Sequence, residues 1–164
     1  MRTDAFRKHF ETGLEALMLT LMAALALVVI IGVGFRKAGA ALVWYDEVAS
    51  VLLAWLTYYG ASFAALKRAH IGFPKLVQSV RPSLRRALVI AREIVVVSFF
   101  VLVAWAGWQV LQILQGIYLT SLPSVPARLT QSVIPISAVL FIVAELISFA
   151  ELWPWLTSRE ETDW

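Results

Sequence analysis

The residues ALMLTLMAALALVVIIGVGF, positions 16–35, include no charged side chain and show what kind of protein this is. A helix rises about 1.5 Å per residue and needs roughly 20 residues to cross the hydrocarbon core of a bilayer, which is about 30 Å thick. The stretch therefore predicts a transmembrane helix over residues 14–35. Its apolar run is longer than the roughly 7–15 residues of a signal peptide, and Phe35 and Arg36 form no cleavage site. We therefore expect the helix to be retained.

Three further apolar stretches predict transmembrane helices over residues 46–66, 92–114 and 131–153. The last contains Glu145, which suits a span only if its carboxylate lies near a membrane surface. The composition agrees, because 60% of the residues are hydrophobic and 15% are charged, whereas soluble chains have about 45–50% and about 25%. The expected fold is an all-α integral membrane protein with four transmembrane helices, forming one domain over residues 1–164.

Lysine and arginine residues are distributed unevenly between the two sides of the predicted membrane protein. The N-terminus, the second loop and the C-terminus carry 11 of them, and the other two loops carry 3. Because basic residues near span ends stay in the cytoplasm, we expect both termini and the second loop to be cytoplasmic. The cytoplasmic set is Arg2, Arg7, Lys8, Lys67, Arg68, Lys75, Arg81, Arg85, Arg86, Arg92 and Arg159, and the opposite set is Arg36, Lys37 and Arg128.

The second loop is predicted to contain a short helix over residues 73–84. Its apolar residues recur at helical spacing, and Pro74 falls in a first turn, where proline is tolerated. Lys75 and Arg81 lie on the other face. This pattern is typical of an amphipathic helix on the cytoplasmic membrane surface, with its cations toward anionic headgroups. An ordinary connector whose apolar face packs on a partner protein is the alternative.

Charged residues at the span ends are candidates for function, because charge inside lipid is costly. Asp46 and Glu47 follow Trp44 at the outer end of the second helix. There they either neutralise the positive end of the helix dipole or contact a partner protein. Glu145 and Arg92 are expected at similar depths near the inner surface, where they would form a structural ion pair. The other basic residues at this depth are Lys67 and Arg68.

Two side-chain patterns inside the spans predict contacts between helices. Gly60 and Ala64 form a small-residue face on the second helix, which allows the close approach of another helix. Trp105 and Trp108 are three residues apart on the third helix, a spacing that favours packing on a neighbouring helix over stacking on a cofactor. These patterns predict contact but not the identity of the neighbour.

Residue types that the sequence lacks narrow the function further. The chain has no cysteine and only two histidines, His9 and His70, which lie outside the predicted spans. Thiolate metal sites, thiol redox chemistry and a haem ligated within a span are therefore excluded. The sequence contains no P-loop, H-E-x-x-H or G-x-S-x-G motif, and no span has a carboxylate near its centre. We expect no enzymatic activity and no cofactor.

Two stretches of the chain match the pattern of a known family. The first is WYDEVASVLLAWLTYYGASFAALKRAHI, residues 44–71, with an aromatic and acidic helix start and a basic end. The second runs from Thr120 through a Leu-Pro pair to Ile-Pro-Ile at residues 134–136. In order and spacing they resemble the DctQ-like small membrane subunit of TRAP (tripartite ATP-independent periplasmic) transporters. The resemblance covers nearly the whole chain.

The resemblance implies a supporting role in secondary active transport. Such small subunits pair with a large permease in the bacterial inner membrane, which moves its substrate by an elevator-like motion, and a periplasmic binding protein delivers the substrate. The implied substrate is an organic acid of the dicarboxylate, keto acid or sialic acid type, taken up by symport with sodium, and the sodium sites belong to the large subunit. Contacts with these partners or with membrane lipids are then expected at Trp44, Asp46, Glu47, Trp55, Gly60, Ala64, Lys67, Arg68, His70, Trp105 and Trp108.

The alternative is a self-sufficient small four-helix carrier that acts as a homo-oligomer. Such a carrier would need a carboxylate embedded in the first helix, and residues 16–35 contain none.

Overall fold

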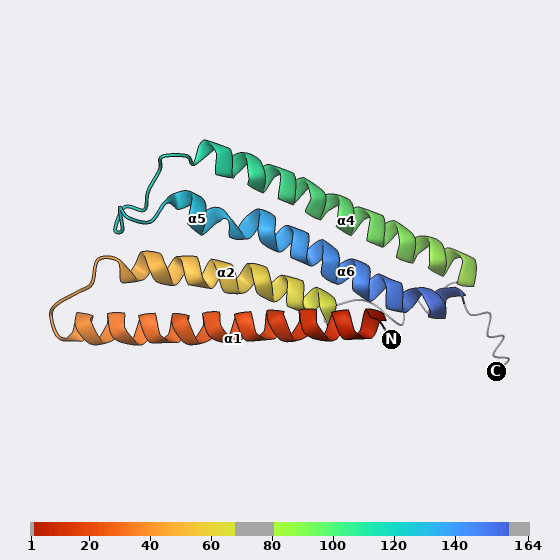
Figure 1. Ribbon diagram of the computed structural model, residues 1–164, viewed down its shortest axis with the longest axis horizontal. Helices are drawn as coiled ribbons and strands as arrows, with labels where there is room; N and C mark the ends of the chain where they lie inside the picture. Colours follow the sequence, from red (N-terminus) through yellow and green to blue (C-terminus); the bar gives the residue numbers. More distant parts are fainter. Residues whose placement is uncertain (1, 68–80, 158–164) are drawn as a thin grey trace.

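The computed structural model describes residues 2–67 and 81–157 of the chain. Its helices are α1 (Arg2–Lys37), α2 (Tyr45–Leu66), α4 (Pro82–Ile113), α5 (Ala127–Gln131) and α6 (Val133–Thr157), shown in Figure 1. Four stretches are long and apolar enough to cross a membrane, namely Arg7–Lys37, Tyr45–Leu66, Leu84–Ile113 and Ala127–Trp153. The predicted all-α membrane fold with four transmembrane helices is confirmed.

Two of the helices start earlier than the sequence predicted. Helix α1 begins at Arg2 rather than at residue 14, and α4 begins at Pro82 rather than at residue 92. Most of the predicted surface helix over residues 73–84 lies outside the described residues. Its last three residues form the first turn of α4.

The four long helices lie side by side in one layer, in the order α1, α2, α6, α4 (Figure 1). Helix α6 packs between α2 and α4, and α2 packs between α1 and α6, so α1 and α4 form the two edges. We call the end at which α1 begins and α6 ends the basic end, and the opposite end the loop end. The molecule is therefore a plate with two central helices and two edge helices.

Helix α6 supplies more buried residues than any other helix of this plate. One cluster joins Ala65 and Leu66 of α2 to Phe141 and Ala144 of α6, and the Phe100 ring of α4 stacks on Phe141 with centroids 3.7 Å apart. A second cluster near the loop end packs Leu21 of α1 and Tyr59 of α2 against Val133. The strongly apolar α6 is thus buried on two sides, as expected for a central helix.

Buried serines fasten α2 to α6 through the backbone. The Ser62 hydroxyl donates to the carbonyl of Ser137 at 3.1 Å, and the Ser148 hydroxyl donates to the carbonyl of Ala65 at 3.1 Å. Hydroxyl groups of this kind hold membrane helices together where lipid offers no hydrophobic driving force. The two bonds fix the position of α6 along α2 at two depths.

The proline at the start of α6 disrupts little. Helix α5 ends at Gln131 and α6 begins at Val133, so Pro135 lies in the first turn, where an N–H group has no helical partner. The break between α5 and α6 therefore keeps this proline out of a helix interior. Across the seam, Gly107 of α4 faces this turn so closely that a Cβ atom there would lie 2.9 Å from Ile134 Cγ2 and from Pro135 Cδ.

We predict that Gly107→Ala destabilises the α4–α6 seam. The added methyl group would meet the Pro135 ring and, at 3.1 Å, its backbone nitrogen, neither of which can turn away. Overpacking of this kind costs about 1–3 kcal/mol, which exceeds the gain of about 1 kcal/mol for replacing glycine in a helix. Thermal denaturation of the purified protein in detergent should therefore show a lower midpoint.

The matched control is Gly34→Ala, because no atom lies within 4 Å of a Cβ at Gly34. Its midpoint should equal or exceed that of the unchanged protein. Equal midpoints for the two variants would mean that the Gly107 contact does not limit packing.

Candidate functional site

Ion pairs join the helices toward the basic end. The Arg7 guanidinium on α1 lies 2.6 Å from the Glu151 carboxylate on α6, and Lys67, which follows α2, pairs with Glu11 on α1. These pairs are partly exposed, so each contributes little stability alone. Together they hold α1 to both central helices.

Another ion pair, with a buried carboxylate, lies between α4 and α6. Arg92 Nη2 lies 2.6 Å from Glu145 Oε1, and Glu145 is 3% exposed. A second carboxylate, Glu93, is 7% exposed, and its Oε2 lies 3.6 Å from Arg92 Nη1. Its Oε1 has no hydrogen-bond partner within the described part of the chain. One guanidinium thus serves two buried carboxylates, and only Glu145 is within hydrogen-bond distance of it.

The sequence reasoning paired Arg92 with Glu145 but did not assign Glu93 to the cluster. The helical spacing could have found it, because Glu93, Phe100 and Gly107 recur every seven residues on the face of α4 that meets α6. A charge on that face is buried, whereas its neighbour Arg92 has a half-exposed side chain.

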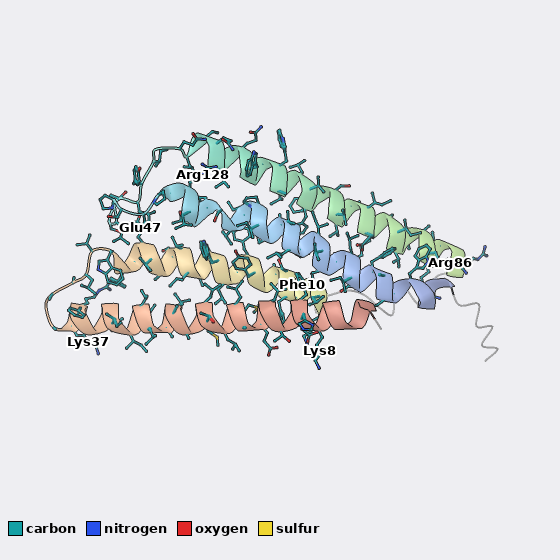
Figure 2. All side chains as sticks on the ribbon, in the orientation of Figure 1. Lys8, Phe10, Lys37, Glu47, Arg86 and Arg128 are labelled. Carbon is teal, nitrogen blue, oxygen red and sulfur yellow. The ribbon has the colours of Figure 1, made fainter. Side chains whose placement is uncertain are left out.

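At the loop end, Glu47 holds the loop between α4 and α5. Its carboxylate accepts hydrogen bonds from the backbone N–H groups of Thr120, at 3.3 Å, and Ser121, at 2.9 Å, and from the Ser121 hydroxyl. Figure 2 shows Glu47 at this end of the molecule. From the sequence, two roles were predicted for this residue, namely helix capping or contact with a partner protein. The structure gives a third role, because the carboxylate connects α2 to a loop 73 and 74 residues away.

Asp46 differs from its neighbour. Its side chain is 74% exposed and lies 3.7 Å from the Arg36 guanidinium, which also lies over the ring of Tyr45. Tyr45 in turn fills the space beside Gly32, where any Cβ would overlap its ring. The end of α1 therefore packs against the start of α2. The Asp46 carboxylate remains accessible to solvent. Trp44 precedes this pair and is half-buried.

The loop held by Glu47 is folded. The Leu119 N–H donates to the Val125 carbonyl at 3.0 Å, and the Ala127 N–H donates to the Ile117 carbonyl at 2.9 Å. Gly116, with φ of 78°, provides the left-handed conformation from which the chain enters this turn. The loop end thus presents an ordered surface.

Trp55 and Gly60, which are candidate contact residues on α2, contact other helices of the same chain. Trp55 Nε1 donates to the Thr130 carbonyl of α5 at 2.8 Å. A Cβ at Gly60 would lie 3.8 Å from Met18 Cε, so the small-residue face meets α1. Ala64 is half-buried in the same central helix. Arg68 and His70 lie outside the described residues.

Trp105 and Trp108 lie on the outer edge of the plate. They are 64% and 55% exposed, so no helix in the described part of the chain covers them, and the neighbour that their spacing predicted is not one of these helices. Neither indole N–H has an acceptor among the described residues. Of the sequence candidates, these two and Asp46 offer side chains to a partner.

The chain matches the family described as Tripartite ATP-independent periplasmic transporters, DctQ component, over residues 2–154. It belongs to the DctQ family. No curated protein matches the chain. The family is a transporter component rather than an enzyme family, and its members work with a large TRAP permease and a binding protein. This DctQ chain is thus the small permease subunit of a TRAP transporter and a multi-pass membrane protein.

We predict opposite effects for the two buried carboxylates of this DctQ subunit. Glu145→Gln removes the hydrogen-bonded partner of Arg92 and should lower the unfolding free energy by roughly 2–4 kcal/mol. Glu93→Gln removes the carboxylate that lacks a hydrogen bond and should leave stability unchanged or raise it. Thermal denaturation in detergent and the yield of folded protein measure both.

Glu151→Gln is the control, because its pair with Arg7 is more than 30% exposed on both sides and should contribute less than about 1 kcal/mol. If Glu93→Gln destabilises the protein as much as Glu145→Gln, the guanidinium is shared equally and Glu145 is not the principal tether.

Proposed function

We propose that this chain is the static small subunit of a sodium-coupled TRAP system for organic acid uptake, with a substrate of the dicarboxylate, keto acid or sialic acid type. Family membership supports the role, and the resemblance of the sequence supports the substrate class and the coupling ion. The chain lies in the bacterial inner membrane with the basic end in the cytoplasm. The clustering of lysine and arginine at that end supports this orientation.

The observation that carries the proposal is the single layer of helices in which α6 is fixed on both sides. An elevator-type permease needs one part that stays in place while another moves through the membrane. Serine–backbone hydrogen bonds on one seam and the ion pair of the buried Glu145 on the other hinder α6 from sliding along its neighbours. The plate can therefore extend the stationary part of the permease. The substrate and sodium sites belong to the large subunit, and this chain binds no cofactor.

The α4 edge is the surface that contacts the large permease. The stretch from Arg92 to Ile113 covers about 32 Å, and Trp105 lies about 4 Å from its midpoint. An indole N–H at that depth finds no acceptor in lipid tails but can find one on a protein helix. The exposed residues of α1 at comparable depth, such as Leu27 and Ile30, are aliphatic and suit lipid. The two edges thus differ in what they can bind.

At the loop end, the accessible carboxylate of Asp46 contacts the large permease or the binding protein on the periplasmic side. The folded loop beside it, held by Glu47, supplies a surface of fixed shape for that contact. Docking without a change in backbone shape limits the entropy that association costs.

Reconstitution tests the proposed function. Vesicles containing this subunit, its large permease and the binding protein should take up an organic acid under an inward sodium gradient, and omission of the subunit should abolish or strongly reduce uptake. Vesicles containing this chain alone should show no flux. Uptake by the chain alone would support a self-sufficient carrier instead.

We predict that Trp105→Leu together with Trp108→Leu weakens the complex with the large permease by at least about tenfold. Large aromatic anchors at interfaces contribute about 2 kcal/mol or more when truncated. The measurement is the amount of large permease that co-purifies with the tagged subunit from the same membranes.

The control is Leu27→Ala together with Ile30→Ala on the other edge, which should leave co-purification unchanged. Equal loss for both double variants, or loss only for the α1 variant, would contradict the assignment of the α4 edge.

A further inference from the structure

Polar side chains lie on the outer face of α4, the helix at one edge of the plate (Figure 1). Ser98, Trp105 and Gln109 are all exposed. Successive helical residues are about 100° apart around the axis, so these three positions fall within about 40° of one another. Gly107, which faces α6, lies about 160° away from Gln109. We call Ser98, Trp105 and Gln109 the polar stripe, and it points away from the rest of the plate.

The polar stripe has hydrogen-bonding groups that the chain itself does not use. The Ser98 hydroxyl and the Gln109 amide, like the Trp105 indole, have no hydrogen-bond partner among the residues that the structure describes. Exposed hydroxyl groups on two other helices differ, because Thr20 on α1 and Thr57 on α2 each donate to a carbonyl of their own helix at 2.8 Å. The stripe is therefore available for hydrogen bonds with another molecule.

The depth of the polar stripe indicates what that molecule is. Ser98 and Gln109 lie about 9 Å and about 26 Å beyond Arg92 along the helix, so both fall within a hydrocarbon core about 30 Å thick that begins near Arg92. Lipid tails offer no hydrogen-bond partner, and a polar group that faces them loses the bonds that it makes in water. A helix of another membrane protein can supply the missing partners. The stripe therefore favours a protein helix over lipid.

The spacing of the polar stripe limits how the neighbouring helix can lie. Ser98 and Gln109 are eleven residues apart, which is about three turns and about 16 Å along α4. At a crossing angle of about 20°, two helix axes move sideways by only about 3 Å over half of that length, whereas at about 50° they move by about 10 Å. A single helix can therefore contact both residues only if it runs nearly along α4.

We propose that a transmembrane helix of the large permease lies along α4 at a crossing angle of about 20° and hydrogen-bonds to Ser98 and Gln109. The Trp105 indole lies between these two contacts and donates to an acceptor on the same helix. The permease helix thereby continues the layer beyond α4, on the side opposite α6. This inference rests on the proposed function, because it takes the large permease as the partner. It adds which face of α4 is used and how the partner helix is oriented.

Loss of the two polar contacts tests the hydrogen bonds. Ser98→Ala together with Gln109→Leu should weaken the complex with the large permease by at least about fivefold, since one hydrogen bond between membrane helices contributes roughly a factor of three. The measurement is the amount of large permease that co-purifies with the tagged subunit over a dilution series. The matched control is Phe99→Leu together with Val110→Leu, which changes exposed residues at the same depths on another face and should leave the affinity unchanged.

Cross-linking tests the position of the partner helix. The chain contains no cysteine, so Ser98→Cys and Gln109→Cys each provide one attachment site for a benzophenone maleimide. Phe99→Cys and Val110→Cys are the controls, because each lies one residue further along and about 100° around the helix. Illumination of the assembled complex should link the permease to labels at positions 98 and 109 and not to those at positions 99 and 110.

Several results would overturn the inference. They are an unchanged affinity of the Ser98→Ala and Gln109→Leu double variant, cross-links that are equal at all four positions, and a cross-link at only one of positions 98 and 109, which would indicate a steeply crossed helix. Sodium-driven uptake that depends on the subunit, without cross-links at either position, would also overturn this inference and leave the proposed function intact. Cross-links at both positions in a complex that shows no uptake would support the contact and overturn the proposed transport function instead.

Discussion

The structure depends on how helices hold together when the solvent is lipid. Apolar side chains gain nothing from meeting one another there, so contact requires close packing, hydroxyl–backbone hydrogen bonds and compensated charge. Helix α6 has all three, with Ala144 and Phe141 in the core, Ser148 bonded to α2 and Glu145 paired across the seam to α4. The layer exists because one helix can make strong contacts on two opposite sides.

This arrangement uses buried polar groups of the plate for contacts between helices. Ser62, Ser148 and Glu145 each have a partner on the adjacent helix, whereas one carboxylate oxygen of Glu93 has none among the described residues. What remains for partners lies on the periphery, at Trp105 on one edge and Asp46 at the loop end. The proposed scaffold role uses these outer surfaces and leaves the interior of the plate unchanged.

The sequence predicted the spans and part of the charge pairing, for different physical reasons. Span length follows from bilayer thickness alone, and the pairing of Arg92 with Glu145 follows from depth, which residue counting gives. The lateral order of the helices could not be predicted, because an apolar run does not identify its neighbour. Gly60 was therefore considered for a partner protein although it faces α1, and Glu47 was considered for capping although its partners are distant in the chain. Contacts that depend on which helix lies beside which require the three-dimensional structure.

The central position of α6 has a consequence for biogenesis. Helix α6 follows α1, α2 and α4 in the chain, so during synthesis the ribosome delivers it after the two helices between which it belongs. Until then α4 lacks the helix on which it packs, and the Glu93 carboxylate has only Arg92 of its own helix as an ionic partner. Helices α2 and α4 therefore gain the neighbour that they share only when α6 inserts between them and completes the layer.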